Sequence, residues 1–419
     1  MSDRTVFVYV DLNGSAHLVG RMWVHTRRTK ESSTFEYDPT WLQNPERFAL
    51  EPALQLGEGA FHPPADKIMF GAIGDSAPDR WGRVLMRRAA RRRAEEEGVA
   101  PHTLQEIDYL LAVDDTARQG GLRFSEQEGG PFLADQDAAK IPPLIELPRL
   151  LAATEKVIDD DDDDEDLRIL LAPGSSLGGA RPKASVRDYD GQLAIAKFPR
   201  KDDEYNTVAW EVVALELARK AGINTAKSRF EHIADKPVII LDRFDREGEN
   251  RIPFLSAMSM IGAKDNESHS YLEIVDAIRQ YGARPIEDMH ELWRRIVFTI
   301  LISNSDDHMR NHGFLYGGTD GWMLSPAYDL NPVPLDIKPR ILSTAIDFDD
   351  QSASLPLALS VAEYFELSDD EARNIAGHVA DAVSCWRSEA GEAGLSAGEC
   401  NRMASAFEND DLELATSFL

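Results

Sequence analysis

The chain opens with two short runs of β-branched and aromatic residues that are separated by a two-residue turn signal. The runs are Val6–Val10 and His17–Val24, and Asn13-Gly14 lies between them. Both central residues of a type I′ turn take positive φ, which asparagine and glycine tolerate best. The pattern therefore predicts a β-hairpin at the start of the chain.

Beyond residue 190, short apolar runs alternate with one clear helical period. Leu193–Phe198 and Lys236–Leu241 predict strands, whereas Thr207–Ala221 has apolar residues near one helical face and is followed by Gly222. From about Glu287 onward the pattern is mainly helical. A β-rich segment with one helix, followed by a helical segment, predicts two lobes with a cleft between them.

Two runs of charge interrupt this pattern. A predicted helix from about Arg80 to Gly98 carries six arginines after Arg80, and residues 159–166 are eight consecutive acidic residues. The helix is either a docking surface for an acidic partner or a nucleic acid, or a solvated face balanced by Glu95–Glu97. We favour the solvated face, because such runs usually serve solubility. The acidic run repels itself, so it predicts a flexible linker that marks a domain boundary.

The composition predicts a folded, acidic protein of two or three domains. Apolar residues make up 43% of the 419 residues, and the formal net charge is −28. Such a charge repels phosphate backbones, so DNA would be reached only indirectly, through a basic partner. Cys385 and Cys400 are too few for a disulfide framework, and neither an export signal nor an apolar run of 18 residues is found. We expect a cytoplasmic protein without a membrane segment.

Candidate chemistry is concentrated in Ser303–Asn311, directly after the apolar run Leu292–Ile302. Asp306 and Asn311 are five positions apart. Phosphoryl transfer to a hydroxyl needs a carboxylate that orients the nucleophile and accepts its proton, and an asparagine oxygen on the same loop can ligate Mg²⁺. The spacing alone is a weak signal, because aspartate and asparagine are common in loops.

A second aspartate strengthens the interpretation. Gly313–Tyr316 and Trp322–Leu324 predict two short strands, and Asp329 follows them. A catalytic loop, a hairpin and then an aspartate that holds Mg²⁺ is the order found in kinases. The alternative is that Asp329 is a cap or turn residue before Pro332.

Two upstream features could contact nucleotide phosphates. Lys197 lies inside an apolar strand, where an unpaired ammonium is costly, and Glu211 on the next helix could hold it. The alternative is an edge strand from which Lys197 points outward. Gly178 and Gly179 form a glycine-rich loop before a strand, which can bring backbone N–H groups to phosphates or be only a flexible turn. The loop has neither P-loop nor dinucleotide-site spacing.

In this order, the motifs resemble the HipA family of toxin kinases, the toxin half of HipA/HipB modules. The resemblance spans most of the chain. It is carried by the N-terminal hairpin, GDSAPDRWGR (Gly74–Arg83), ARQGGLRF (Ala117–Phe124), SSLGGARPKASV (Ser175–Val186), AKFP (Ala196–Pro199), WEVVALELARKAGI (Trp210–Ile223), LDRFDR (Leu241–Arg246), NSDDHMRNHGF (Asn304–Phe314) and LSPAYDL (Leu324–Leu330).

The resemblance implies an α+β, eukaryotic-protein-kinase-like fold of two lobes after a β-rich N-terminal subdomain. The implied domains are 1–150, the N-terminal subdomain; 151–275, the kinase N-lobe with the acidic linker 159–166; and 276–419, the helical C-lobe. It also implies an ATP- and Mg²⁺-dependent serine/threonine kinase with a HipB-like antitoxin as partner and glutamyl-tRNA synthetase as substrate.

The resemblance also assigns roles to individual residues. Those expected to act in the reaction are Asp306 as catalytic base, His308 as support of its loop, and Asn311 and Asp329 as Mg²⁺ ligands. Those expected to bind ATP are Lys197, Glu211, Gly178, Gly179 and Lys183, with Asp242 and Phe244 in a hinge beside adenine. Ser176 is the expected autophosphorylation site, because added negative charge near ATP would be repelled.

The sequence departs from the family at three points. The loop reads GGARPK where the family often carries GAQxK, with Arg181 and Pro182 in place of polar residues. This difference concerns the self-inactivation switch more than catalysis. Asp242 stands where a longer acidic residue is common, and the acidic run is not a family feature.

Two other functions remain open from the residues. The Asp-x-His-x-x-Asn spacing of residues 306–311 also occurs in lipid-kinase loops, so a small-molecule or lipid kinase is one alternative. The other is a corepressor that acts only by binding its antitoxin on DNA. The filled catalytic positions favour an active kinase.

Overall fold

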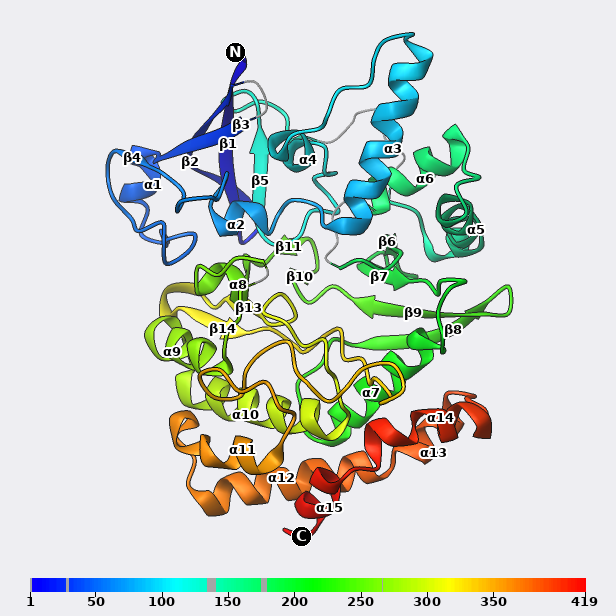
Figure 1. Ribbon diagram of the computed structural model, residues 1–419. Coiled ribbons are helices and arrows are strands. Elements are labelled where there is room, and N and C mark those ends of the chain that lie inside the picture. The colour runs from blue at the N-terminus through cyan, green and yellow to red at the C-terminus, as the bar shows by residue number, and fades with distance from the viewer. Residues whose placement is uncertain (1, 28–29, 134–140, 175–178, 266) are drawn as a thin grey trace. The chain divides into compact units, whose positions relative to one another are not determined.

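A computed structural model describes residues 2–27, 30–133, 141–174, 179–265 and 267–419 (Figure 1). The chain divides into two compact units. Unit 1 comprises Met1–Asp202 and His232–Leu255, and unit 2 comprises Asp203–Glu231 and Ser256–Leu419. Sheets dominate unit 1 and helices dominate unit 2, which confirms the predicted α+β class. The domain boundaries at residues 150 and 275 stay predictions.

The N-terminal sheet of unit 1 is antiparallel and has the strand order β4-β3-β2-β1-β5. Its strands are β1 (Ser2–Leu12), β2 (Ser15–Arg27), β3 (Lys30–Tyr37), β4 (Ala60–Phe61) and β5 (Leu122–Ser125). Asn13 and Gly14 have φ values of 53° and 78°, as a type I′ turn requires. The hairpin predicted from Asn13-Gly14 is therefore confirmed.

A second sheet has the strand order β6-β7-β9-β8, and unit 1 contains its antiparallel strands β6 (Lys183–Arg187), β7 (Leu193–Lys197) and β9 (Lys236–Asp242). Alternate residues of each strand, such as Ala184, Ala196 and Ile240, belong to one buried cluster. The same cluster contains residues of the helices α3 (Arg80–Glu96), α5 (Leu147–Ile158) and α6 (Asp164–Gly174). Because side chains alternate along a strand, one face of this sheet supplies a common core with the helices. Strands β7 and β9 agree to within one residue with the strands predicted at 193–198 and 236–241.

The remaining elements of unit 1 are short. They are α1 (Pro39–Gln43), α2 (Gly71–Gly74), α4 (Glu106–Leu111), η1 (Leu144–Glu146), β10 (Arg246–Glu247) and β11 (Asn250–Arg251). Two strands lie where the chain crosses between the units, namely β8 (Ser228–Ile233) and β12 (Phe254–Ser256).

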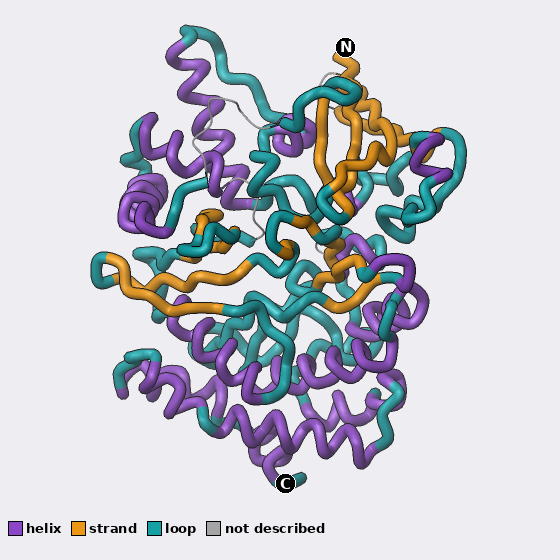
Figure 2. Tube along the Cα trace, turned by 180° about the vertical axis from the view of Figure 1, so that it is seen from behind, coloured by secondary structure: helices purple, strands orange, loops and turns teal. Residues whose placement is uncertain are grey.

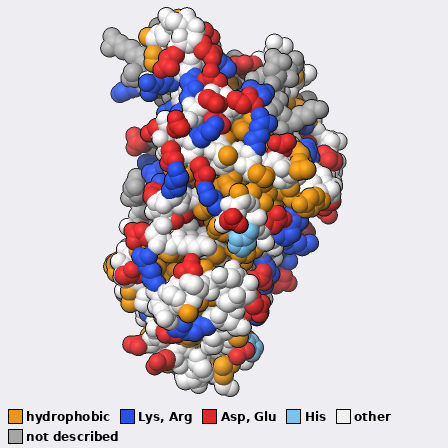
Figure 3. All heavy atoms as spheres, turned by 90° about the vertical axis from the view of Figure 1, so that its right-hand side faces the viewer, with side chains coloured by type: hydrophobic (Ala, Val, Ile, Leu, Met, Phe, Trp, Pro, Cys, Tyr) orange, Lys and Arg blue, Asp and Glu red, His pale blue; other side chains and the backbone are white. Residues whose placement is uncertain are grey.

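The acidic run at 159–166 is not the unpaired linker that its charge predicts. Helix α6 begins within it at Asp164, and the side chain of Asp162 is only 3% exposed. Arg88 of α3 pairs with Asp160 and Asp162, and Arg92 of α3 lies 2.7 Å from Asp164. The prediction was wrong because opposite charges, distant in sequence, offset the repulsion within the run. Figure 3 shows acidic and basic side chains similarly interspersed on one face.

Unit 2 is built around the long helix α10 (Pro285–Leu301), eleven of whose residues are buried. Around it pack α9 (Tyr271–Tyr281), α11 (Leu355–Ser360), α12 (Asp369–Ser384) and α15 (Asp410–Thr416). Figure 2 shows these C-terminal helices running side by side. Helix α7 (Thr207–Lys220) contacts α12 and α13 (Trp386–Glu392), and its Trp210 lies 6.1 Å from the Trp386 ring. The mainly helical prediction therefore holds for most of this unit.

The helical pattern of unit 2 is interrupted after α10. A hairpin of β13 (Gly313–Tyr316) and β14 (Trp322–Leu324), joined through η2 (Gly318–Asp320), is followed by irregular loops over 325–354. The other elements are α8 (Ala257–Met260), η3 (Ala362–Phe365) and α14 (Ala397–Phe407). The hairpin agrees with the prediction. Among the described residues, no helix is long and apolar enough to cross a membrane.

Two β-turns allow a matched test of turn energetics in unit 1. Ala234 and Asp235, just before β9, both have positive φ (47° and 62°), and Ala234 is exposed. An alanine in this region is strained, whereas asparagine tolerates it. We expect Ala234→Asn to raise the free energy of unfolding by about 1 kcal/mol and Asn13→Ala to lower it by a similar amount. Urea unfolding of the two variants measures both; a loss of stability in Ala234→Asn would contradict the expectation.

Candidate active site

The loop at residues 303–311 begins with a strained residue at the end of α10. Ser303 has a φ of 51°, an uncommon conformation for a residue with a side chain. Its hydroxyl donates to the Ala406 carbonyl at 2.8 Å, and its own carbonyl accepts from Val333 N–H at 3.3 Å. These contacts hold the chain in a sharp change of direction, so the following residues leave the helix axis as a loop.

Asp307 anchors this loop from inside. Its carboxylate is buried and accepts hydrogen bonds from the Tyr271 hydroxyl at 2.6 Å and the Thr299 hydroxyl at 3.4 Å. The ring of His312 lies 3.1 Å from the other carboxylate oxygen. The backbone carbonyl of Asp307 accepts from Thr344 Oγ1 at 2.7 Å. A buried carboxylate with this many donors fixes the loop on three separate segments.

The same contacts set the protonation of the pair. Burial alone would raise the pKa of Asp307, but His312 and the Tyr271 hydroxyl outweigh it and the pKa is lowered. Burial raises the pKa of Tyr271 well above its usual value, and the neighbouring Asp307 charge adds to this effect. Tyr271 therefore stays a hydrogen-bond donor to an ionised carboxylate.

Asp306, the predicted base, differs from its neighbour in being open to solvent. Its side chain is 69% exposed, and the Lys338 ammonium lies 4.0 Å from its carboxylate. The same ammonium donates to the Ser305 carbonyl at 3.0 Å. Two adjacent aspartates thus have separate environments: Asp307 is a structural anchor and Asp306 is accessible to a substrate hydroxyl.

The two predicted metal ligands come from neighbouring segments of unit 2. Asn311 Nδ2 donates to the Asp306 carbonyl at 3.1 Å, which leaves its side-chain oxygen as the atom for a cation. The Tyr328 hydroxyl donates to the Arg310 carbonyl at 2.7 Å, so the residues just before Asp329 and Asn311 are in contact. Asp329 has a φ of 59°, a further uncommon conformation. A carboxylate and an amide oxygen are the donors that Mg²⁺ prefers, so this set fits the ion.

His308 is more exposed to solvent than the residues that support the loop and that the sequence did not predict. It is partly exposed, and its Nδ1 is buried with no hydrogen-bond partner among the described residues. The buried supports of the loop are instead Asp307, His312 and Tyr271. Asp307 and His312 are in the same motif, but only their burial shows their role. Tyr271 is 36 positions away from Asp307 and gave no sequence signal. The predicted role of His308 stays a prediction.

Unit 1 contributes a pair of buried lysines. Lys183 on β6 and Lys197 on β7 are direct partners in the antiparallel register, and they are 5% and 8% exposed. Like charges that face each other across strands are destabilising, and buried ammonium groups need anionic partners. Helix α3 contacts this end of β6, because Trp81 Nε1 donates to the Lys183 carbonyl at 3.0 Å. The register therefore places two buried positive charges side by side on β6 and β7.

The glycine-rich loop is described only in part. Gly179 has a φ of 98°, and a Cβ placed there would lie 2.5 Å from Lys183 Nζ and 3.7 Å from an Asp79 carboxylate oxygen. The positive φ favours glycine at this position, whereas the close Lys183 ammonium is the end of a flexible side chain that could move aside. The predicted phosphate-loop residue Gly178 and the predicted autophosphorylation site Ser176 lie outside the described residues.

The remaining predicted residues are split between the units. Asp242 ends β9 and is exposed, and the ring of Phe244 lies 6.3 Å from that of Phe254. Both are in unit 1 with Lys197. Glu211 is buried on α7 of unit 2. Its ion pair with Lys197 and the adenine contacts of the hinge therefore stay predictions.

Comparison with known families decides the relationship of the chain. The sequence pattern of the HipA-like C-terminal domain matches residues 175–386, about half of the chain. The chain belongs to the HipA-like C-terminal domain family. This match covers β6, β7, the loop at 303–311 and the hairpin that follows it. The resemblance drawn from the motifs is thereby confirmed.

Two curated relatives of this HipA-like chain are named as kinases. It is 24% identical over 181 residues to "Putative kinase Y4mE" of Sinorhizobium fredii (strain NBRC 101917 / NGR234), over 37% of this chain and 41% of that protein. It is 28% identical over 189 residues to "Putative kinase" of Haemophilus influenzae, over 38% of this chain and 54% of that protein. The chain thus matches about half the length of these relatives.

One solved structure shares the fold along nearly the whole chain. It is the complex of the Shewanella oneidensis MR-1 toxin–antitoxin system HipA and HipB with operator DNA. The match has a TM-score of 0.66, covers 98% of this chain and 96% of the matched chain, and has 15% sequence identity. The similarity shows that the fold, including the N-terminal sheet, is that of a known structure.

The Asp307 network gives a pH-dependent test within unit 2. The folded pKa of Asp307 is below its unfolded value of about 3.9, so its stabilisation is complete above that pH and is lost as pH falls through the folded pKa. Tyr271→Phe removes a donor, raises the folded pKa and shifts this loss to higher pH. We also expect a decrease of about 1.5–3 kcal/mol in the free energy of unfolding at pH 7.

Urea unfolding between pH 3 and 7 measures both effects. Tyr364→Phe is the matched control, because this partly exposed tyrosine of unit 2 contacts Arg279 through its backbone carbonyl. Equal stability losses in the two variants, or an unchanged acid limb in Tyr271→Phe, would rule out the proposed anchoring role of Asp307.

Proposed function

We propose that this HipA-like chain is an ATP- and Mg²⁺-dependent protein serine/threonine kinase, the toxin of a toxin–antitoxin module. The observation that carries the proposal is the loop of unit 2, where an accessible Asp306 is held by Asn311 and by the buried Asp307. Membership of the HipA-like family and the two kinase-named relatives support it. Each of these supports a kinase more directly than it supports the choice of substrate.

In the proposed mechanism, Asp306 orients the substrate hydroxyl and accepts its proton as the oxygen attacks the terminal phosphorus of ATP. The bond from that phosphorus to the ADP oxygen breaks, and ADP leaves. The Lys338 ammonium, 4.0 Å from Asp306, places a positive charge beside this carboxylate. Asn311 and Asp329 would hold Mg²⁺, which neutralises phosphate charge when bound. In unit 1, Lys183 and Lys197 would contact the phosphates and Gly179 would let the backbone approach them.

The partner and target are proposed from the family. A HipB-like antitoxin is the proposed partner, supported by the fold shared with the HipA, HipB and operator DNA complex. DNA would then be reached through the antitoxin, in keeping with a net charge of −28. We propose a translation-related substrate, by family glutamyl-tRNA synthetase, together with autophosphorylation of Ser176, and a cytoplasmic location.

The proposed base is tested by one conservative substitution. Asp306→Asn keeps the size of the side chain but cannot accept a proton, so we expect the rate of phosphate transfer to fall about 10²–10⁴-fold with an unchanged fold. The measurement is incorporation of label from [γ-³²P]ATP, followed by phosphoamino acid analysis. Asp320→Asn, an exposed aspartate of η2 in the same unit, is the matched control and should keep full activity.

The same assay separates the rival functions. Label on serine or threonine of protein supports the proposal, and label only on lipids or small molecules supports the small-molecule kinase. If Asp306→Asn leaves both labelling and growth inhibition at the wild-type level, the kinase mechanism is wrong and the corepressor becomes the better explanation.

The metal site has a separate signature. Asn311→Ala removes one proposed Mg²⁺ ligand while the Asp307 anchor remains, so we expect the Mg²⁺ concentration for half-maximal activity to rise about tenfold or more. Asp329→Asn should behave similarly. Titration of activity with MgCl₂ at saturating ATP measures the change. A variant that loses activity with no change in its Mg²⁺ dependence would show that the residue serves another role.

A further inference from the structure

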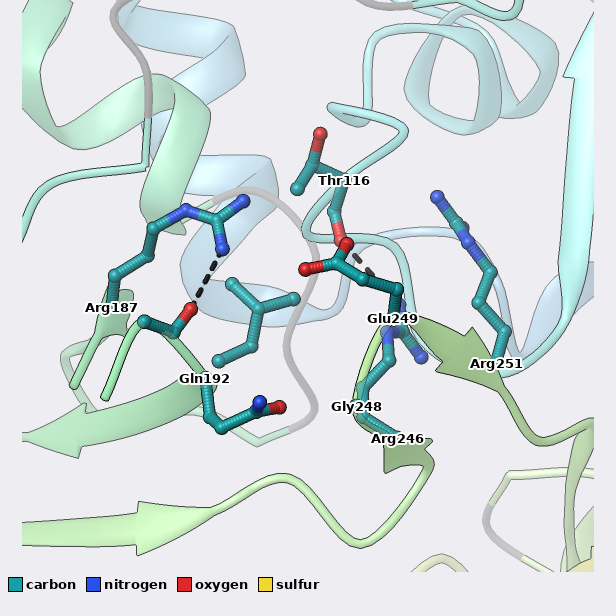
Figure 4. Close-up of a pocket in the computed structure, with 9 residues that line it drawn as sticks. Thr116, Arg187, Gln192, Arg246, Gly248, Glu249 and Arg251 are labelled. Carbon is teal, nitrogen blue, oxygen red and sulfur yellow. Dashed lines mark hydrogen bonds between the residues drawn. The ribbon is translucent and has the colours of Figure 1, made fainter. Parts of the chain in front are cut away.

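Unit 1 contains a small cavity away from the two lysines. Its volume is about 60 Å³, and it is lined by three arginines, Arg187, Arg246 and Arg251, together with Thr116, Glu249 and neighbouring residues of β7 and the β10–β11 turn. Figure 4 shows the side chains that border it. A cavity of this size has room for a few waters or one small tetrahedral anion.

The arginines lie in unfavourable positions for like charges. Arg246 and Arg251 are direct partners across the antiparallel pair β10–β11, and their side chains are 6% and 9% exposed. Facing like charges repel one another, and burial reduces the screening by water. Arg246 directs its donors to protein carbonyls and to Asp245. It therefore contributes positive charge to the cavity wall.

The surrounding buried network has more arginines than aspartates. Its arginines are Arg118, Arg123, Arg243, Arg246 and Arg251; its buried aspartates are Asp11, Asp115 and Asp245, with the partly exposed Asp114 at the edge. In keeping with incomplete compensation, burial lowers the pKa of Arg118 and of Arg246 to about 9. A negative charge in the cavity would offset part of this excess.

Arg251 supplies a donor without a partner. Its Nη2 donates to the backbone and side-chain oxygens of Asp115, but its Nη1 is buried and makes no hydrogen bond to any residue that the structure describes. Leaving a buried charged donor unsatisfied is costly. On the other side of the cavity, Arg187 donates from Nη1 to the Gly191 carbonyl at 2.9 Å, as Figure 4 shows. Arg187 and Arg251 thus border the cavity from two sides.

We propose that this cavity is a binding site for a small oxyanion of the phosphate class, held by Arg251 and Arg187. The protein as a whole carries a charge of −28, so a general attraction for anions is not the reason for binding. The exposed Glu249 borders the same space (Figure 4) and competes with an anion by repulsion. The arginines of the cavity would therefore bind one anion despite the repulsion from Glu249 and from the net negative charge of the chain.

The proposed site shares two strands with the lysine pair but is separate from it. Arg187 pairs with Leu193 at one end of β6 and β7, and Lys183 pairs with Lys197 at the other. Four residues of extended strand separate them, roughly 13 Å. An anion bound near Arg187 would therefore steady the same strands that carry the lysines. The proposal does not depend on kinase activity.

Binding of inorganic phosphate to the full-length chain tests the proposal. Isothermal titration with sodium phosphate, at constant ionic strength set by sodium chloride, should show saturable binding of one phosphate to the Lys197→Gln variant, in which the lysine pair is disabled. In the same background, Arg187→Gln should weaken binding about tenfold or more, because one charge-assisted hydrogen bond is lost. Glu249→Gln should strengthen it.

Two controls keep the test decisive. Arg200→Gln removes an exposed arginine of unit 1 that pairs with Asp202, and it should bind phosphate as the Lys197→Gln background does. Arg251→Gln should abolish binding; because it also loses contacts to Asp115, its fold is checked by circular dichroism. Equal affinities in the Arg187→Gln and Arg200→Gln variants, or no saturable binding in the Lys197→Gln background, would overturn the proposal.

Discussion

The buried carboxylate of Asp307 is the constraint on which the candidate catalytic loop depends. It ties α9 through Tyr271, α10 through Thr299 and the start of β13 through His312. A charge inside a protein is stable only when donors surround it, so these segments cannot separate without exposing or orphaning the carboxylate. Asp306, the next residue toward the N-terminus, is consequently presented to solvent from a fixed backbone. Asp307 thus holds the loop in place, whereas the adjacent Asp306 is exposed to solvent.

Unit 1 differs, because its buried charges face charges of the same sign. Its sheets bring like charges face to face, with Lys183 opposite Lys197 and Arg246 opposite Arg251. Such arrangements lower stability unless anions compensate them, so they are expected where binding matters more than stability. The chain around them is strongly acidic overall. The arginine pair lines the cavity proposed to bind an anion, and contact of the lysine pair with nucleotide phosphates stays a prediction.

The two charge runs pair with each other although they are distant in the sequence. Like charges repel one another among the arginines of α3, and they do so among the acidic residues 159–166. Neither run can therefore be understood without the other. In the structure, Arg88 and Arg92 pair with carboxylates about 70 positions away, and α6 starts inside the acidic run. The pairs brace the helix that leads toward the glycine-rich loop. Charge patterning in one segment therefore had meaning only together with the other.

The sequence by itself determined the local elements, the family and the order of the candidate residues. Asn13-Gly14, the strand of Lys197 and the hairpin before Asp329 were predictable because turn propensity and side-chain periodicity act over a few residues. Only the tertiary structure decided that Asp307 is a buried anchor, that Tyr271 supports it, and that Arg246 and Arg251 border a cavity. These properties depend on burial and on contacts between distant segments, and they cannot be predicted from a single sequence.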